Sequence, residues 1–428
     1  MSRLRQSLLF FFLLSCASSA FAKDQETFAP SEHVTLGDNV QIRLSANDSG
    51  QVGHIFHLPN GLDVSYGDLV AMGDFYEIVD KPIAFGKNEA ERRSRFLTAF
   101  HSFAQSPSAV SEAKQILAVI HNEKKAVEDA VSRGENPEDV YQKMGKDNNR
   151  QYNCITGGGC SPSTWWTQPG RYLNLASSNY DHFGDYAWIA YQTGHQLALE
   201  QAILARQTQD PAKLELAYAM NAFATHFLSD RFSAGHMRTP RKELADKVTP
   251  ATVGSLLSNY MHNEENINSL HVHNRRGDHW IAYGDGSYFN QKNKMHRAHI
   301  QETVQLSADQ VFIAYQQGEA QNDEHLFDLI PEADETGNAS NQDLSPLFYW
   351  NSKTQKLMRR EDVSNLYDRH WTDNWWGWST LALLSQDRGL PTRAQAALVQ
   401  AGYGEEALQA GLLTDKDIVN YVKKAKAK

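Results

Sequence analysis

The sequence predicts an all-α fold, a multi-helix bundle with a small β-hairpin near the N-terminus and a helical extension at the C-terminus. Three long segments carry apolar residues at the spacing of a buried helix face, residues 108–133, 185–207 and 211–230. Strand-type patterning is confined to residues 34–66. Hydrophobic residues make up 41% and charged residues 21% of the 428 residues, which indicates a globular protein with a sizeable core.

The first 22 residues are predicted to be a secretory signal peptide. Arg3 and Arg5 precede a short apolar run, and the sequence Ala-Phe-Ala at 20–22 fits a small-residue cleavage site. We therefore expect a secreted or periplasmic protein. The sequence Leu-Leu-Ser-Cys ending at Cys16 also resembles a lipoprotein cleavage box, so an outer-membrane lipoprotein is the less favoured alternative. No later stretch is long and apolar enough to span a bilayer.

The remaining elements follow in chain order. Within 34–66, a Pro-Asn-Gly turn separates two runs of β-type residues and predicts a hairpin. After the three long helices, the patterning predicts a polar loop at 333–345. Shorter helices are expected at 304–320, 374–386, 391–401 and 414–427.

Cys154 and Cys160 flank the sequence CITGGGC. In an oxidising compartment two such close cysteines are expected to form a disulfide, and the glycines give the backbone the freedom to close so short a ring. A phosphate-binding loop is a weaker interpretation of these glycines, because neither a preceding strand nor a following Lys-Ser/Thr pair is present.

The net charge of −10 provides no general attraction for nucleic acid or for an anionic membrane. We therefore expect no stable nucleic-acid partner. Four tryptophans lie close together in the segment HWTDNWWGWSTL, namely Trp371, Trp375, Trp376 and Trp378. Such a cluster can bind a cation, a base or lipid, but core packing is its more common role.

The stretch HFLSDRFSAGH ends the helical pattern at 211–230. His226 and Asp230 are four residues apart, so a helix places both side chains on one face. His236 follows after Gly235, which allows the chain to turn back toward them. The pair predicts two ligands to one metal ion, whereas a simple hydrogen-bonded pair is the alternative.

Two neighbouring segments strengthen the metal interpretation. Upstream, the chain supplies His182 and His195 with nearby aspartates that include Asp181, and downstream it supplies His262, Glu264 and Glu265. Buried ionisable groups are costly unless they are paired, and a multinuclear metal site satisfies many of them at once.

The pattern H-x3-D-x5-H resembles the signature of zinc-dependent phospholipases C and of the related zinc-dependent single-strand nucleases. Together with DHFGDYAWIAYQTGH and HNEEN…GDHWIAYGDG, it is most similar to the bacterial metallophospholipase C branch. The resemblance covers residues 170–290, with a weaker similarity at 66–76, YGDLVAMGDFY. It implies two or three zinc ions.

The resemblance also implies a ligand set. One zinc would be bound by Asp181, His195, His226 and Asp230, and a second, to which Asp230 bridges, by His236, His262 and Glu264, with Glu265 as the alternative glutamate. Members of the family place the last carboxylate one helical turn after its histidine, but this chain has Asn266 there.

A third zinc is bound in the best-known members by the amino group and carbonyl of an N-terminal tryptophan. Signal cleavage would instead leave Lys23 or a lipidated Cys16 at the N-terminus. Other residues would therefore have to supply such a site, and the first candidate is Asp74, followed by His182.

Taken together, the resemblance predicts a zinc-dependent phosphodiesterase that hydrolyses glycerophospholipids such as phosphatidylcholine, at a membrane or micelle surface, to diacylglycerol and a phosphorylated head group. Asp181 would orient the attacking water or accept its proton, and Asp230 would bridge two zincs. A single-strand nuclease or nucleotidase is the first alternative, and a non-catalytic helical protein stabilised by zinc is the second.

The predicted organisation has four parts. Residues 1–22 form the signal peptide, and 23–150 form an N-terminal region of hairpin plus helices that belongs to the catalytic body. Residues 151–300 form the zinc-binding catalytic core, and 301–428 form the helical C-terminal extension.

Overall fold

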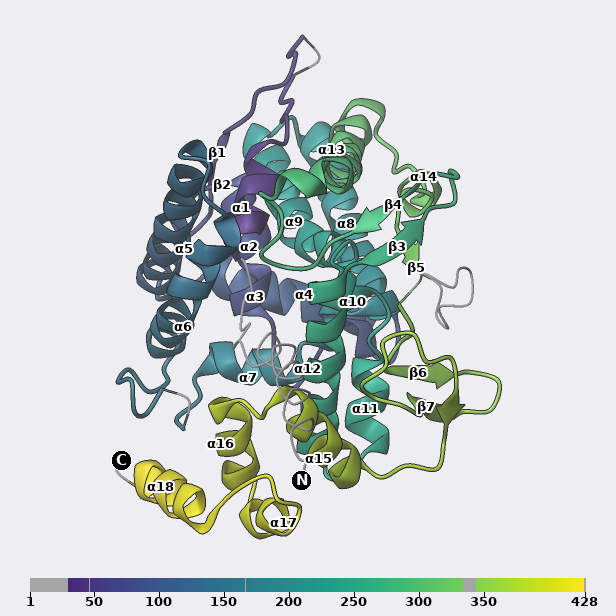
Figure 1. Ribbon diagram of the computed structural model, residues 1–428. Helices are drawn as coiled ribbons and strands as arrows, with labels where there is room; N and C mark the ends of the chain where they lie inside the picture. The colour runs from purple at the N-terminus through teal and green to yellow at the C-terminus, as the bar shows by residue number, and fades with distance from the viewer. Residues whose placement is uncertain (1–29, 46, 166, 334–343, 427–428) are drawn as a thin grey trace, which may run out of the picture.

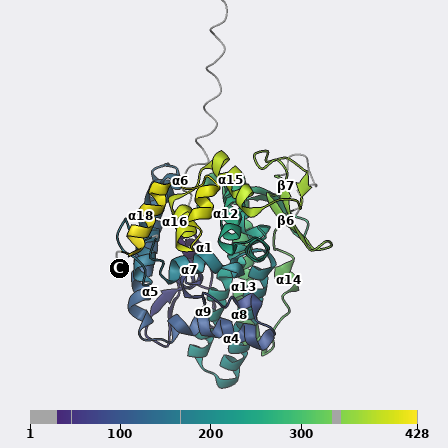
Figure 2. The same cartoon turned by 90° about the horizontal axis from the view of Figure 1, so that it is seen from below.

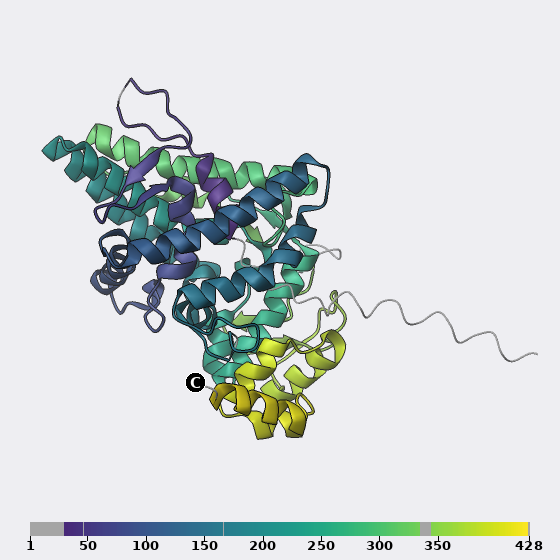
Figure 3. The ribbon, with the colours of Figure 1, turned by 90° about the vertical axis from the view of Figure 1, so that its left-hand side faces the viewer.

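Three long helices pack side by side in the computed structural model (Figures 1 and 3). They are α8 (Gly184–Thr208), α9 (Pro211–Asp230) and α13 (Lys294–Gln317). Helices predominate in the fold, as the sequence predicted. The structure describes residues 30–45, 47–165, 167–333 and 344–426.

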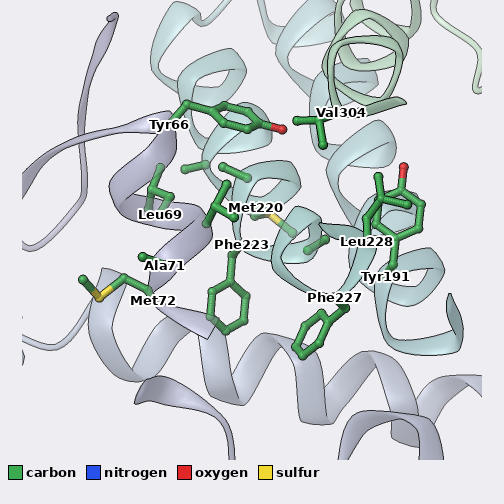
Figure 4. Close-up of a cluster of buried hydrophobic side chains, with 14 of the residues drawn as sticks. Tyr66, Leu69, Ala71, Met72, Tyr191, Met220, Phe223, Phe227, Leu228 and Val304 are labelled. Atoms are coloured by element: carbon green, nitrogen blue, oxygen red, sulfur yellow. The ribbon is translucent and has the colours of Figure 1, made fainter. Parts of the chain in front are cut away.

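Helix α9 is buried on nearly every side from Leu214 to its end. Asp210 caps its start by accepting a hydrogen bond from the Ala212 amide, and Pro211 fits the first turn because it needs no amide partner there. Apolar residues run all around the helix, as expected for one enclosed by others. Figure 4 shows Phe223 and Phe227 of α9 within the central apolar cluster.

Elements of the N-terminal half pack against one side of α9. Residues 55–65 form the predicted hairpin, in which β1 (Ile55–His57) pairs antiparallel with β2 (Asp63–Ser65). The earlier part of the region 34–66 forms no regular strand: residues 34–38 belong to α1, and after them an isolated bridge joins Ile42 to Gln51. The helices of this half are α1 (Pro30–Asp38), α2 (Tyr66–Ala71), α3 (Gly73–Tyr76), α4 (Glu89–Ala104), α5 (Ala109–Ser132) and α6 (Pro137–Ile155).

The disulfide between Cys154 and Cys160 is present, as predicted. The side chain of Asn153 organises the loop that the disulfide closes: its amide donates to the carbonyls of Gly159 and Trp165, and its carbonyl accepts from the amide of Gly170. After this loop, α7 (Arg171–Ser178) leads to a single 3-10 turn, η2 (Tyr180–His182), and then to α8.

After α9 the chain forms α10 (Ala234–Met237), α11 (Arg241–Lys247) and α12 (Ala251–Asn268). A three-stranded antiparallel sheet follows, with the order β4 (His279–Ala282), β3 (Leu270–His273) and β5 (Glu332–Ala333). The helix α14 (Glu324–Phe327) precedes β5.

The C-terminal part is not purely helical, which corrects the prediction. It contains a second three-stranded antiparallel sheet, β6 (Phe348–Asn351), β7 (Lys356–Arg360) and β8 (Trp371–Thr372). These strands are too short to show a clear alternation in sequence. The helices predicted here are present as α15 (Gly377–Arg388), α16 (Thr392–Gln400) and α18 (Asp415–Lys426), joined by α17 (Gly404–Gln409).

Apolar residues of this part form a second core with α11 and α12, and Figure 2 shows its helices gathered at one side of the molecule. Trp378 is buried in that core, and the indole N–H of Trp375 donates to the Leu357 carbonyl. Trp371 donates similarly to Pro346. Only Trp376 is largely exposed, at 63%. The tryptophan cluster is therefore mainly packing.

The predicted signal peptide, with Cys16, lies outside the described residues, as does most of the predicted polar loop. Within the part of the chain that is described, none of the helices has the length and hydropathy needed to cross a membrane.

Candidate metal centre

Histidine and aspartate side chains from seven segments converge. Five of these segments are the helices α1, α3, α9, α10 and α12, whose places Figure 1 shows. In the described residues they form three groups, and within each group the candidate ligand atoms lie within 4.8 Å of one another. The groups are His33–Asp74–His226, His182–His226–Asp230 and His236–His262–Asp285.

The first two groups share His226, and α9 ends at Asp230 just beyond it. The Nε2 atom of His226 lies 3.7 Å from Asp74 Oδ1 and 3.4 Å from Asp230 Oδ2. The same Asp230 oxygen lies 2.7 Å from His182 Nδ1. The helical spacing of His226 and Asp230 therefore places both residues in one group, as the sequence predicted.

The third group gathers around Asp285, in the loop after β4. Its Oδ2 atom lies 3.4 Å from His236 Nε2 and 3.3 Å from His262 Nε2. His236 also connects this group to the others, because its Nδ1 lies 4.0 Å from Asp230 Oδ2. The other oxygen of Asp230, Oδ1, lies 3.4 Å from His33 Nε2. Asp230 therefore lies close to candidate ligand atoms of all three groups.

Hydrogen bonds hold Asp285 in place. Ser233 Oγ donates to Asp285 Oδ1 at 2.7 Å, and Asn266 Nδ2 donates to Oδ2 at 3.1 Å. The carboxylate of Glu32 accepts hydrogen bonds from the amides of Gly286 and Tyr288, which fixes the loop that follows. The resemblance implies a carboxylate at residue 266. In this chain Asn266 instead donates a hydrogen bond to the carboxylate of Asp285, which comes from another segment.

Burial and charge set the protonation of these groups. Burial lowers the pKa of His226 well below its usual value, so the ring is held neutral, the form that binds metal. Burial would raise the pKa of Asp285, but His236 and His262 hold it well below its usual range. Burial also opposes ionisation of Asp230, yet His226 and His182 lower its pKa. Both of these carboxylates are therefore anionic.

Two acidic groups behave differently. Burial raises the pKa of Asp74 to about 8, against the attraction of His182. Burial likewise raises the pKa of Glu32 to about 8. The surrounding positive charge is therefore not enough to keep the carboxyl groups of Asp74 and Glu32 ionised. A bound cation would stabilise their charged forms.

The unsatisfied polar atoms indicate where a cation fits. Among the described residues, Asp74 Oδ2 and His226 Nδ1 are buried without a hydrogen-bond partner. Buried polar atoms left in this way are costly and call for an explanation. Asp230 Oδ2 is surrounded by histidine nitrogens, with His182 Nδ1 at 2.7 Å and His226 Nε2 at 3.4 Å. Imidazole nitrogens and carboxylate oxygens are the ligands that zinc prefers when cysteine is absent. These buried groups can therefore hold a metal ion.

A pocket opens onto the groups between α1, the end of α9 and the loop after β4. Its lining includes Asp74, His182 and Asp230, and its volume of about 60 Å³ is enough for ions and a few waters. Less polar lining residues are Leu36, Tyr283, Tyr288 and Ile300.

Gly73 allows α3 to lie directly against His226. A Cβ atom at this position would stand 2.1 Å from His226 Cγ. Gly73→Ala is therefore expected to displace the imidazole and to weaken metal binding by about 10-fold or more, as measured by competition with a chelator. Gly404→Ala is the matched control, because a Cβ there meets only ordinary contacts at 3.7 Å. Equal metal affinities in the two variants would contradict this role for Gly73.

The structure brings six of the sequence-predicted residues together. They are the four ligands His226, Asp230, His236 and His262, and the two additional candidates Asp74 and His182.

Four other predicted residues are placed elsewhere, and the candidate ligand set is corrected accordingly. Asp181 accepts hydrogen bonds from the amides of Ile83 and Ala84, so its carboxylate anchors the chain before α4. Both ring nitrogens of His195 are used, since Nε2 lies 2.7 Å from Gln310 Oε1 and Nδ1 accepts from Asn221.

The two glutamates of α12 point to arginines. Glu264 is bound by Arg360 and Arg388, both of which come from the C-terminal part. Arg238 Nε donates to Glu265 at 2.7 Å. Ion pairing by buried arginines, which sequence spacing alone does not reveal, explains why these carboxylates stay outside the three groups.

His33 and Asp285 were missed by the sequence prediction. Asp285 lies in the segment GDHWIAYGDG, and the absence of a carboxylate at Asn266 was the signal that another segment must supply one. His33 follows Glu32 in the first turns of α1, but a single histidine near the start of a short helix carries no distinctive spacing.

Comparisons of this chain with protein-family models, with curated proteins and with solved structures find no match.

Proposed function

We propose that this chain is a secreted zinc-dependent phosphodiesterase of the phospholipase C type, which hydrolyses glycerophospholipids to diacylglycerol and a phosphorylated head group. The proposal rests on the three convergent groups of histidines and aspartates, and above all on Asp230, whose carboxylate is within reach of donors in each of them. The signature H-x3-D-x5-H at 226–236, which resembles that of the zinc phospholipases C, supports it.

The donor set favours catalysis over a purely structural role for the metal. Structural zinc sites are usually closed by four ligands and are often rich in cysteine. Here the candidate ligands are histidine and aspartate, Cys154 and Cys160 are joined in a disulfide elsewhere, and a pocket reaches the candidate ligands. The disulfide is also consistent with secretion.

The two predicted zinc positions correspond to different donors from those implied by the resemblance. His182, His226 and Asp230 would hold one ion, and His236, His262 and Asp285 would hold another. His33 and Asp74 would serve a third ion beside His226. Zinc bound here would act as a Lewis acid on the phosphate and would make an attacking water more acidic.

The chain's own residues position the reacting groups. Asp74 takes over the role that the sequence prediction gave to Asp181, because its Oδ2 is buried beside His226 and lacks a hydrogen-bond partner in the described structure. We assign it to orient the attacking water and to accept its proton. Asp230, held anionic by the histidines around it, is the carboxylate that the two neighbouring sets of ligands would share.

The lining of the pocket supports a lipid substrate. It combines the candidate ligands Asp74, His182 and Asp230, which suit a phosphate group, with Leu36, Tyr288 and Ile300, which provide contact for an apolar part of the substrate. The net charge of −10 is unfavourable for an extended nucleic acid.

The test is an assay of the zinc-loaded protein, without its signal segment, on phosphatidylcholine micelles, on single-stranded DNA and on a nucleoside monophosphate. Each substrate is measured with and without a chelator. We expect phosphatidylcholine turnover that the chelator abolishes and zinc restores. Turnover of only the DNA or the nucleotide would replace the proposal with a nuclease or nucleotidase. Zinc binding without any turnover would replace it with a structural role for the metal.

A further inference from the structure

Glu77 directly follows α3 and contacts one of the proposed ligands. Its side chain is buried, and the Nε2 atom of His182 forms a short hydrogen bond with Glu77 Oε1. The opposite ring nitrogen, His182 Nδ1, faces the metal groups, 2.7 Å from Asp230 Oδ2 and 3.2 Å from His226 Nε2. Each nitrogen of this ring therefore has a different partner.

A histidine that binds a metal through one nitrogen commonly donates its other N–H to a carboxylate, which fixes the tautomer and the ring orientation. Glu77 meets this description for His182. The carboxylate accepts the Nε2 proton, and only Nδ1 is left with a lone pair for a metal ion.

The backbone of His182 also fixes a ligand of the third group, His236–His262–Asp285. Its carbonyl accepts a hydrogen bond from His236 Nδ1 at 2.9 Å, so that His236 turns its Nε2 toward Asp285. Any shift of the His182 segment would therefore disturb ligands of both proposed zinc positions.

We propose that Glu77 is a positioning residue of the metal centre: it holds His182 in the tautomer that binds zinc through Nδ1 and, through the His182 carbonyl, orients His236. This inference rests on the metal centre of the proposed function and not on the identity of the substrate. It also gives the short segment from Gly73 to Glu77 two tasks, since Asp74 supplies a ligand and Glu77 fixes another.

The first experiment measures zinc affinity of the mature protein by competition with a chromophoric chelator. Glu77→Ala is expected to weaken zinc binding about 10- to 100-fold. Glu77→Gln, which keeps an oxygen acceptor without the charge, should lose less. Glu123→Gln is the matched control, because Glu123 is also a buried glutamate but is bound by Ser31 and Asn148 and not by a candidate ligand. Wild-type affinity in Glu77→Ala would overturn the proposal.

The second experiment needs no variant of Glu77 and so does not depend on whether one folds. In the zinc-loaded wild-type protein, ¹⁵N-detected ring signals of His182, assigned by comparison with His182→Gln, should show a proton on Nε2 and a metal bond at Nδ1. The reverse pattern would contradict the proposal. Both readouts are independent of lipid hydrolysis: a protein that binds zinc as described but cleaves no phospholipid refutes the phospholipase assignment alone, and one that binds no zinc refutes both.

Discussion

Replacing Asp230 with asparagine is expected to cause the largest loss of metal and of activity of any single substitution in this chain. Its carboxylate lies 2.7 Å from His182 Nδ1 and 3.4 Å from His226 Nε2, and it reaches toward His236 and His33 as well. Asparagine keeps the size of the side chain but removes the negative charge that several ligands and ions would share. Zinc affinity should fall by more than the roughly 10- to 100-fold that loss of a ligand's hydrogen-bonding partner costs.

The matched control is Asp181→Asn. Asp181 is also a fully buried aspartate, but its oxygens accept hydrogen bonds from Ile83 and Ala84 outside the metal groups. Metal analysis and chelator competition should show near wild-type zinc binding in this variant. If Asp181→Asn loses zinc as Asp230→Asn does, Asp181 is a ligand, as the resemblance implies, and the ligand set given by the geometry is wrong.

Glu264→Gln is expected to have the largest effect on stability. Glu264 is 2% exposed, and its two oxygens accept hydrogen bonds at 2.9 Å from Arg360, which is 0% exposed. Arg388 pairs with the same carboxylate. Neutralising Glu264 removes the ion pair of the fully buried Arg360 and one of the ion pairs of Arg388, so the free energy of unfolding should fall by about 3–5 kcal/mol.

Chemical denaturation measures this loss, and Glu361→Gln, at an exposed glutamate just after β7, provides the control. The folded fraction of Glu264→Gln should still bind zinc with the stoichiometry of the wild type, because Glu264 belongs to none of the three groups. A variant of unchanged stability that no longer binds zinc would mean that Glu264 is a ligand after all.

The long helices were predictable because their signals are local. The segments at 185–207 and 211–230 carry helical periodicity and a proline at the start of the second, and α8 and α9 follow these bounds within two residues. The second sheet was not predictable. Its strands β6, β7 and β8 have two to five residues, and their pairing joins segments whose partners no short pattern specifies.

The site shows the same division between local and long-range information. His226, Asp230 and His236 lie within one motif, and the helical spacing and the turn at Gly235 are enough to predict that they converge. Assigning the remaining partners needed the tertiary structure. His182 and His195 both lie in one histidine-containing segment, and only the fold shows that the first faces Asp230 whereas the second bonds to Gln310.

The sequence prediction named Glu264 as a ligand where the structure has Asp285, and the cause is similar. A glutamate two residues after His262 is a reasonable ligand until the arginines that pair with it, Arg360 and Arg388, are known, and both lie far away in the chain. Asp285 reaches His262 only because β3 and β4 turn the chain back beside α12.

The most direct test of the shared metal centre is anomalous diffraction at the zinc absorption edge from crystals of the zinc-loaded protein. We expect at least two peaks, one beside His182 and His226 and one beside His236 and His262, each about 2.0–2.2 Å from its donor atoms. Asp230 should lie between them, with His182 bound through Nδ1. Zinc peaks beside Asp181, His195 or Glu264, or no zinc at the three groups, would contradict this account.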